Sequence, residues 1–187
     1  DTARSRGLGD VYKRQFLRAL HSLPVRLPGG TPRGDTIRRA DLPHRRGWLH
    51  ERLDELCADV AGVDDAPARA LIDDLAQTPP AAQRTWVHGD LYARHIIVDG
   101  DAFAGVIDWG DVHHGDPALD LSIAYAWLSE ADRGALLSAY GGIDAATARR
   151  ARFRAIHYAI NLLRFGHRTH DAAMIRLAED AWRFSVG

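Results

Sequence analysis

The 187-residue chain has little of several features, and each shortage excludes a class of protein. It contains a single cysteine, Cys57, which excludes an internal disulfide bond. No run reaches the roughly 18 consecutive apolar residues that suggest a membrane-spanning helix, and no secretory signal pattern is present. The sequence therefore predicts a cytoplasmic protein with no membrane partner.

Net charge and lysine are also scarce. The chain has 24 basic and 25 acidic residues, for a formal net charge of -1, and this balance argues against nucleic acid as a partner. Lys13 is the sole lysine, so a role that needs a lysine later in the chain has no candidate. Hydrophobic residues make up 46% of the sequence, which is enough for one core and predicts one globular domain.

The spacing of apolar residues predicts an α+β fold that is mostly α-helical. Residues 24–43 are rich in proline and glycine and are expected to form an irregular connection. Ser129 and Asp144 are expected to cap two of the helices. Helices are predicted over residues 16–23, from 48 to about 62, from 67 to about 78, 117–128, 130–141, from 145 onward, and from about 170 to 184.

A predicted β-hairpin lies within the chemically richest stretch of the chain. A β-branched run and a second apolar run flank Asp99-Gly100, a pair typical of a type I′ hairpin turn. Because a hairpin folds the chain back, Asp108 at its far end is expected close to His95 at its near end. Asp90 begins the loop before His95, so all three side chains are expected to converge.

Phosphoryl transfer has a use for each of these side chains, because it depends mainly on positioning and on neutralising charge. A carboxylate within hydrogen-bond reach orients an acceptor hydroxyl and takes its proton, and Asp90 is the candidate for this catalytic role. Magnesium prefers hard oxygen ligands together with substrate phosphates, which suits Asp108. A neutral imidazole also ligates metals, so His95 is the second candidate ligand.

Three motifs share the order and spacing of a known family: His88-Gly89-Asp90-Leu91, Ile107-Asp108-Trp109, and Asp116-Pro117-Ala118-Leu119-Asp120-Leu121. Together they resemble the aminoglycoside and macrolide phosphotransferases. The resemblance implies a protein-kinase-like C-terminal lobe with a small β-hairpin at its active site. It also implies Mg²⁺-dependent transfer of the γ-phosphoryl group of ATP or GTP to a hydroxyl of an antibiotic or a similar small alcohol. His95 stands where most of the family has asparagine, and histidine there resembles the macrolide kinases in particular.

Three further residues receive supporting roles. By resemblance, Asp120 braces the catalytic loop through backbone contacts. His88 precedes Gly-Asp at the end of a predicted strand, where a buried histidine that hydrogen-bonds the backbone is expected rather than a base. Arg94 is a candidate for contact with the nucleotide phosphates, and pairing with Asp99 is the alternative.

The resemblance also predicts the domain organisation. Residues 1–15 lack apolar periodicity and are expected to be a non-native or disordered leader. Residues 16–187 are expected to form the C-terminal lobe, which carries the catalytic and acceptor-binding residues. The nucleotide-binding N-terminal lobe, with its phosphate-covering loop and its lysine, is expected to precede residue 16 and is absent. The chain is therefore predicted to be an inactive C-terminal fragment of a small-molecule kinase.

Two other classes of function stay open at this stage. One is a non-catalytic module that binds an acceptor or a protein partner. The other is a di-metal hydrolase, because additional side chains of the metal-binding type lie near the candidate site residues in sequence. These additional side chains are His113, His114 and Asp116.

Overall fold

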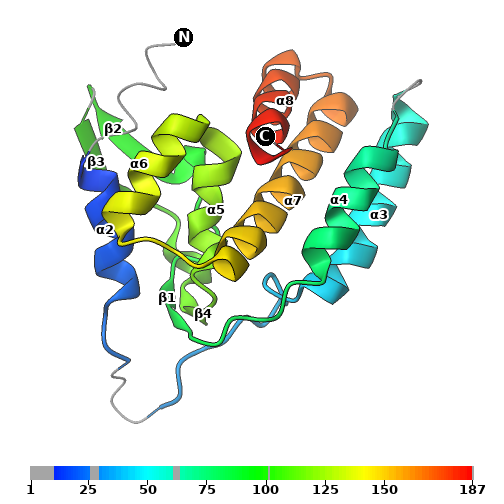
Figure 1. Cartoon of the computed structure of the whole chain (residues 1–187). Helices are drawn as coiled ribbons and strands as arrows, with labels where there is room; N and C mark the ends of the chain where they lie inside the picture. Colours follow the sequence, from blue (N-terminus) through cyan, green and yellow to red (C-terminus); the bar gives the residue numbers. More distant parts are fainter. Residues whose placement is uncertain (1–10, 26–29, 61–63, 101, 187) are drawn as a thin grey trace.

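The structure of the protein is a computed structural model that describes residues 11–25, 30–60, 64–100 and 102–186 (Figure 1). Helices dominate it, as the sequence predicted, and two small antiparallel sheets complete it. None of the described helices combines the length and the apolar character of a membrane span. The helices are α2 (Val11–His21), α3 (Leu42–Asp59), α4 (Ala66–Ala76), α5 (Ala118–Trp127), α6 (Glu130–Tyr140), α7 (Ala145–Thr169) and α8 (Ala172–Val186).

Side-chain caps set the predicted starts of two helices. The hydroxyl of Ser129 accepts a hydrogen bond from the backbone N–H of Asp132 at 3.3 Å, and α6 begins at the next residue. The carboxylate of Asp144 accepts from the N–H of Thr147 at 2.6 Å and begins α7 in the same way. Each cap satisfies a backbone donor that the first turn of a helix leaves free. Both predicted caps are confirmed.

Two helices begin earlier than the sequence predicted. α2 begins at Val11, so the last part of the segment set aside as a leader is helical, whereas residues 1–10 lie outside the described residues. α3 begins at Leu42, where Asp41 caps it, rather than near Trp48. The first turns of α3 are polar and contain a proline, so the apolar spacing that defines the rest of the helix does not extend to its start.

α7 lies between the other helices and belongs to both apolar cores (Figure 1). One core joins α7 to α5 and α8 through residues such as Leu121 and Ala155. The other joins α7 to α3 and α4 through residues such as Ile72 and Phe153, which are 0% and 1% exposed. Burial of one large apolar side chain contributes about 1.5–3 kcal/mol. Side chains of α7 therefore contact α5 and α8 in one core and α3 and α4 in the other.

The predicted hairpin is present and consists of β2 (Ile96–Asp99) and β3 (Ala102–Val106). Asp99 pairs with Ala102, so the turn contains Gly100 and the residue after it rather than Asp99-Gly100. Gly100 has a φ of 57°, which favours glycine. Residue 101 lies outside the described residues, so the predicted turn type is not tested.

A second sheet, which the sequence did not predict, consists of β1 (Thr85–Val87) and β4 (His113–Gly115). The residues of β4 show no apolar alternation, so their pairing depends on contacts from elsewhere in the chain. In the antiparallel register Val87 lies opposite His113. The loop that follows β1 and the loop that precedes β4 therefore lie side by side, and these loops carry the candidate site residues.

Candidate active site

A buried carboxylate fixes the loop that follows β1. Asp120, in the first turn of α5, is 0% exposed and accepts hydrogen bonds from the backbone N–H groups of His88 and Gly89 at 2.7 and 2.9 Å. Its Oδ2 also accepts from Nε2–H of His21 on α2 at 3.1 Å. The hydroxyl of Tyr140 donates to Nδ1 of His21 at 2.8 Å. Sequence reasoning placed Asp120 against this loop but missed His21, which no motif marked.

His88 joins two loops through its ring. Nε2–H donates to the carbonyl of Ile107 at the end of the hairpin at 2.9 Å. Nδ1 then carries the lone pair and accepts from the backbone N–H of Asp90 at 3.4 Å. The ring is 0% exposed, and both of its nitrogens are engaged with the backbone. In this geometry His88 has no nitrogen free to act as a base.

The hairpin brings Asp108 back to His95, as the sequence predicted. Nδ1–H of His95 donates to the backbone carbonyl of Asp90 at 2.9 Å, and Nε2 lies 3.3 Å from Oδ2 of Asp108. Because Nδ1 carries the hydrogen, Nε2 of the neutral ring carries a lone pair. Two electron-rich atoms therefore face each other, an arrangement that a metal cation would stabilise. The donor set, one imidazole nitrogen and one carboxylate, fits a divalent cation that also binds phosphate oxygens.

The backbone of Asp108 adopts a conformation that few residues other than glycine occupy. Its φ and ψ are 65° and 58°, in the left-handed region that aspartate tolerates better than most residues. The side chain is 66% exposed, so most of the carboxylate is open to solvent. The turn at Asp108 thus presents an accessible carboxylate beside a ring that is buried.

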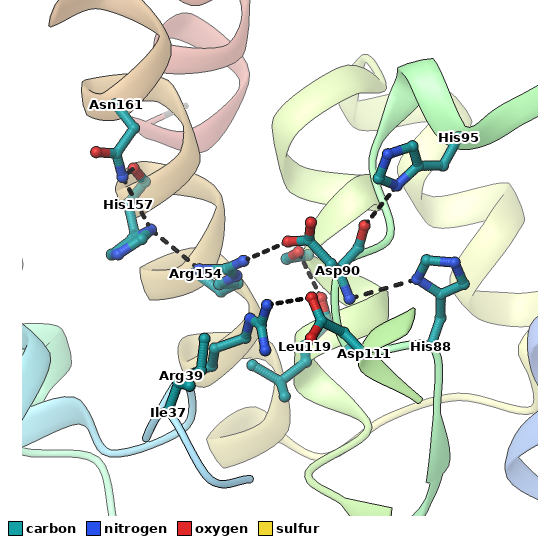
Figure 2. A network of polar contacts seen from close by, with 12 residues as sticks. Ile37, Arg39, His88, Asp90, His95, Asp111, Leu119, Arg154, His157 and Asn161 are labelled. Carbon is teal, nitrogen blue, oxygen red and sulfur yellow. Dashed lines mark hydrogen bonds and ion pairs between the residues drawn. The ribbon is translucent and has the colours of Figure 1, made fainter. Parts of the chain in front are cut away.

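The carboxylate of Asp90 contacts a residue that the sequence did not identify (Figure 2). Its Oδ1 accepts a hydrogen bond from Nη2–H of Arg154 on α7 at 3.1 Å. The contact with His95 comes instead from the backbone carbonyl of Asp90, which corrects the expectation that the three side chains converge. The reason is the 3-10 helix at Ala93–His95, which turns the imidazole of His95 toward the backbone carbonyl of Asp90.

Arg154 belongs to a row of polar side chains on α7. Its Nη1–H donates to Nδ1 of His157 at 3.0 Å, and Asn161 donates to the same nitrogen at 3.2 Å. Burial lowers the pKa of Arg154 to about 10, although the charge of Asp90 opposes this shift. Arg154 is therefore still protonated at neutral pH. Arg154, His157 and Asn161 are spaced by three and then four residues, so their side chains lie on one face of the helix. The sequence could have revealed this polar stripe.

A second ion pair lies beside this contact (Figure 2). Nη2 of Arg39, from the segment before α3, lies 2.5 Å from Oδ2 of Asp111, in the loop before β4. The Arg39 side chain is 11% exposed. Because the two residues are 72 positions apart in sequence, no local pattern indicated the pair. The loop before β4 is thus tied to the segment that leads into α3.

Among the described residues, the remaining candidates form no side-chain hydrogen bond or ion pair with Asp90, His95 or Asp108. Arg94 is exposed, and its alternative partner Asp99 forms no ion pair with it among the residues that the structure describes. Nδ1–H of His113 donates to the carbonyl of Asp111 at 2.7 Å, and Oδ2 of Asp116 binds Nε of Arg150 at 2.7 Å. Within the described ranges, no three or more His, Cys, Asp or Glu side chains are grouped so as to hold a metal ion. The geometry does not support the two-metal alternative.

A cavity of about 650 Å³ has a lining that does not include Asp90, His95 or Asp108. Segments 34–43, 78–84 and 114–116 contribute its lining. Oδ1 of Asp35 and Nε2 of His114 have no hydrogen-bond partner in the described part of the chain, but both atoms are inaccessible to solvent. They therefore do not face the open volume. The two unpartnered atoms therefore do not mark a ligand site in the cavity.

Comparison with known proteins gives a family match and several partial relatives. The model of the phosphotransferase enzyme family matches residues 14–155. Viomycin phosphotransferase of Streptomyces vinaceus is 41% identical over 68 residues, which cover 34% of this chain and 24% of that protein. Homoserine kinase of Pseudomonas aeruginosa (strain UCBPP-PA14) is 36% identical over 85 residues, which cover 45% of this chain and 24% of that protein.

Among solved structures, the GDP complex of wild-type aminoglycoside 2'-phosphotransferase-IIIa is similar along the whole chain. The TM-score is 0.59 at 19% sequence identity, and the match covers 100% of this chain and 63% of that chain. At this level of identity the likeness shows the fold. It confirms the predicted kinase-like C-terminal lobe, which is mostly helical with small antiparallel sheets. The matches span less than two thirds of each of these relatives.

Proposed function

Because this chain belongs to the phosphotransferase enzyme family, we propose that the protein containing it transfers the γ-phosphoryl group of ATP or GTP to a hydroxyl group of a small molecule. The observation that carries this proposal is the pair formed by Nε2 of His95 and Oδ2 of Asp108, 3.3 Å apart. The pair lies next to the loop that presents Asp90. A cation site and a carboxylate on adjacent loops are the parts that phosphoryl transfer requires.

Asp90 is the group that orients the acceptor hydroxyl and takes its proton. Its side chain is 29% exposed, and its backbone follows the two residues that Asp120 holds. Arg154 occupies Oδ1, whereas Oδ2 has no hydrogen-bond partner among the described residues. An acceptor hydroxyl can therefore approach Oδ2. A base positioned in this way contributes about 10²–10⁴-fold to the rate of proton transfer steps.

Asp108 and His95 are the residues that would hold Mg²⁺. The carboxylate supplies an anionic oxygen and the imidazole supplies a nitrogen lone pair, and oxygens of the nucleotide phosphates complete the coordination. When bound, the metal neutralises negative charge on the phosphates. Arg94, exposed on the 3-10 helix that precedes β2, is the proposed source of a second positive charge for those phosphates. In this proposal Arg94 attracts the nucleotide phosphates by its positive charge and has no structural role within the fold.

The proposed acceptor is an antibiotic of the macrolide or aminoglycoside type, or a similar small alcohol. The names of the two curated relatives, viomycin phosphotransferase and homoserine kinase, support a small-molecule acceptor. His95 in place of asparagine supports the macrolide type. The cytoplasm is the proposed compartment because the reaction consumes a nucleoside triphosphate.

A transfer assay tests this function. The full-length protein is incubated with Mg²⁺, ATP or GTP labelled at the γ-phosphate, and a panel of macrolides, aminoglycosides, homoserine and choline. We expect label on one class of acceptor. We expect Asp108→Asn to abolish transfer because the negative charge that would bind Mg²⁺ is lost. Asp99→Asn, an exposed carboxylate on the same hairpin, is the matched control and should keep transfer. Label on no acceptor, or full transfer by Asp108→Asn, would contradict the proposal.

A further inference from the structure

One cation at the candidate site has no role in the function proposed above. Arg154 lies 64 residues after Asp90 in sequence, on a helix that is not part of either loop. Its Nη2 is 3.1 Å from Oδ1 of Asp90, and its side chain is 15% exposed. The guanidinium therefore reaches the proposed base from α7, whereas Asp120 belongs to α5. The loop and the base that it carries are held from two sides.

The position of Arg154 is fixed by its neighbours on α7. Nδ1 of His157 accepts hydrogen bonds from Arg154 at 3.0 Å and from Asn161 at 3.2 Å, so the hydrogen of the neutral ring is on Nε2. Burial lowers the pKa of His157 well below its ordinary value, and the charge of Arg154 adds to the shift. The indole of Trp48 on α3 stacks on this ring, with 4.7 Å between ring centroids. The guanidinium thus has a defined orientation before any ligand binds.

Stability alone is a poor reason for this arrangement. Moving a charged pair out of water costs about as much as its attraction returns, so apolar side chains of similar size often serve the fold as well. Orientation is a better reason, because a carboxylate rotates freely about its last bond unless one oxygen is held. A guanidinium at Oδ1 fixes the direction of Oδ2. An error of about 1 Å in the position of a catalytic group can cost on the order of 10²-fold in rate.

We propose that Arg154 is a positioning residue that holds Oδ1 of Asp90 so that Oδ2 faces the acceptor hydroxyl. This inference rests on the proposed function. In the transfer step, the hydroxyl oxygen forms a bond to the γ-phosphorus, the bond from that phosphorus to the bridging oxygen breaks, and the hydroxyl proton passes to Oδ2. The products are a phosphate monoester and a nucleoside diphosphate. Arg154 touches neither substrate and acts through Asp90.

The test separates positioning from a structural role in the full-length protein. Arg154→Met should lower kcat for acceptor phosphorylation by on the order of 10²-fold and leave KM for the nucleotide nearly unchanged. Arg154→Lys, which keeps a charge, should recover part of the rate, and added guanidinium should partly restore Arg154→Gly. Arg149→Met is the matched control, because Arg149 is on the same helix and binds Asp74 at 2.9 Å. It should keep the parental rate.

Hydrogen exchange gives a readout that does not need turnover. Amide exchange in residues 88–95 should accelerate in Arg154→Met and stay unchanged in Arg149→Met. Unchanged exchange in Arg154→Met overturns the inference, and so does a parental kcat or a rate loss that Arg149→Met shares. If the parental protein phosphorylates no acceptor, the proposed function fails. Amide exchange in residues 88–95 then still shows whether Arg154 holds the loop that carries Asp90.

Discussion

At the scale of single residues, the hydrogen-bond partners of three histidines decide what each can do. His88 donates from Nε2 to a carbonyl and accepts at Nδ1, which leaves neither nitrogen for chemistry. His95 donates from Nδ1 to a carbonyl, which turns the lone pair of Nε2 toward Asp108. His157 accepts at Nδ1 and keeps its hydrogen on Nε2. The same side chain therefore serves as a structural link, a candidate metal ligand and a support for an arginine.

His157 should make the stability of the protein depend on pH. The unfolded chain binds a proton at this residue below about pH 6.5, whereas burial keeps the native ring neutral because its pKa is lowered. Stability is thus fully present above that pH and falls as pH decreases, by up to about 1.4 kcal/mol per pH unit for one proton. Urea unfolding from about pH 7.5 to about pH 5 measures the slope, which His157→Gln should flatten.

The control for this slope is His170→Asn, because His170 is exposed and its left-handed backbone suits asparagine. This variant should keep the parental slope. Equal slopes in the parental protein and in His157→Gln would show that the native ring takes up its proton as readily as the unfolded chain does.

Residue types and spacing were enough to identify some of the candidate residues but not others. Asp90, His95 and Asp108 lie within one short stretch, so a single predicted hairpin was sufficient to relate them. Arg154 and His21 lie far from that stretch in sequence and reach it only through the packing of α7 and α2. Local patterns do not contain these contacts, although the spacing of the polar residues on α7 could have indicated a polar helix face.

At the scale of elements, the β1–β4 sheet and the loop after β1 are packed around one histidine ring. A Cβ atom at Gly89 would lie 2.7 Å from the ring of His113 and 2.7 Å from the carbonyl of Asp111. The φ of Gly89 is 84°, which other residues rarely adopt. A Cβ at Gly115 would lie 2.5 Å from the same ring. Glycine at both positions therefore allows the two loops to approach closely enough to share the site.

Gly89→Ala should disturb this packing. Both the positive φ and the close contacts oppose a methyl group, so we expect a loss of about 1–3 kcal/mol in stability. For a chain of this size that corresponds to a fall in Tm of several degrees, at about 2–4 °C per kcal/mol. Thermal unfolding measures it. Gly105→Ala on β3 is the control, because a Cβ there meets nothing within 4 Å. An unchanged Tm for Gly89→Ala would show that the loop moves aside without cost.

Elements were predicted well where the sequence contains its own start and stop signals. Ser129, Asp144 and the glycine turn of the hairpin are such signals, and the corresponding elements are present. β4 has no such signal, because three polar or small residues become a strand only when β1 lies beside them. The start of α3 was missed for a related reason, since the buried Leu42 is followed by a polar segment and no apolar stripe continues from it until Trp48.

At the scale of the whole molecule, the loop that carries Asp90 is held between two helical parts. Asp120 of α5 holds its backbone and is itself bound by His21 of α2, and Arg154 of α7 holds the carboxylate of Asp90. α7 in turn packs on α3 and α4 through the second apolar core. Through Arg154, α7 thus links α3 and α4 to the proposed base, Asp90. In the proposed function Asp90 performs the proton transfer, and the other contacts fix its position.

The most direct test of this account replaces the carboxylate of Asp90 and keeps its size. In the full-length protein, Asp90→Asn should lower kcat for phosphorylation of the acceptor by on the order of 10²-fold or more, because the amide accepts no proton. Nucleotide affinity should stay at the parental value, since Asp108 and His95 are untouched. A kcat for Asp90→Asn close to that of the parental protein would contradict the account and place the proton acceptor elsewhere.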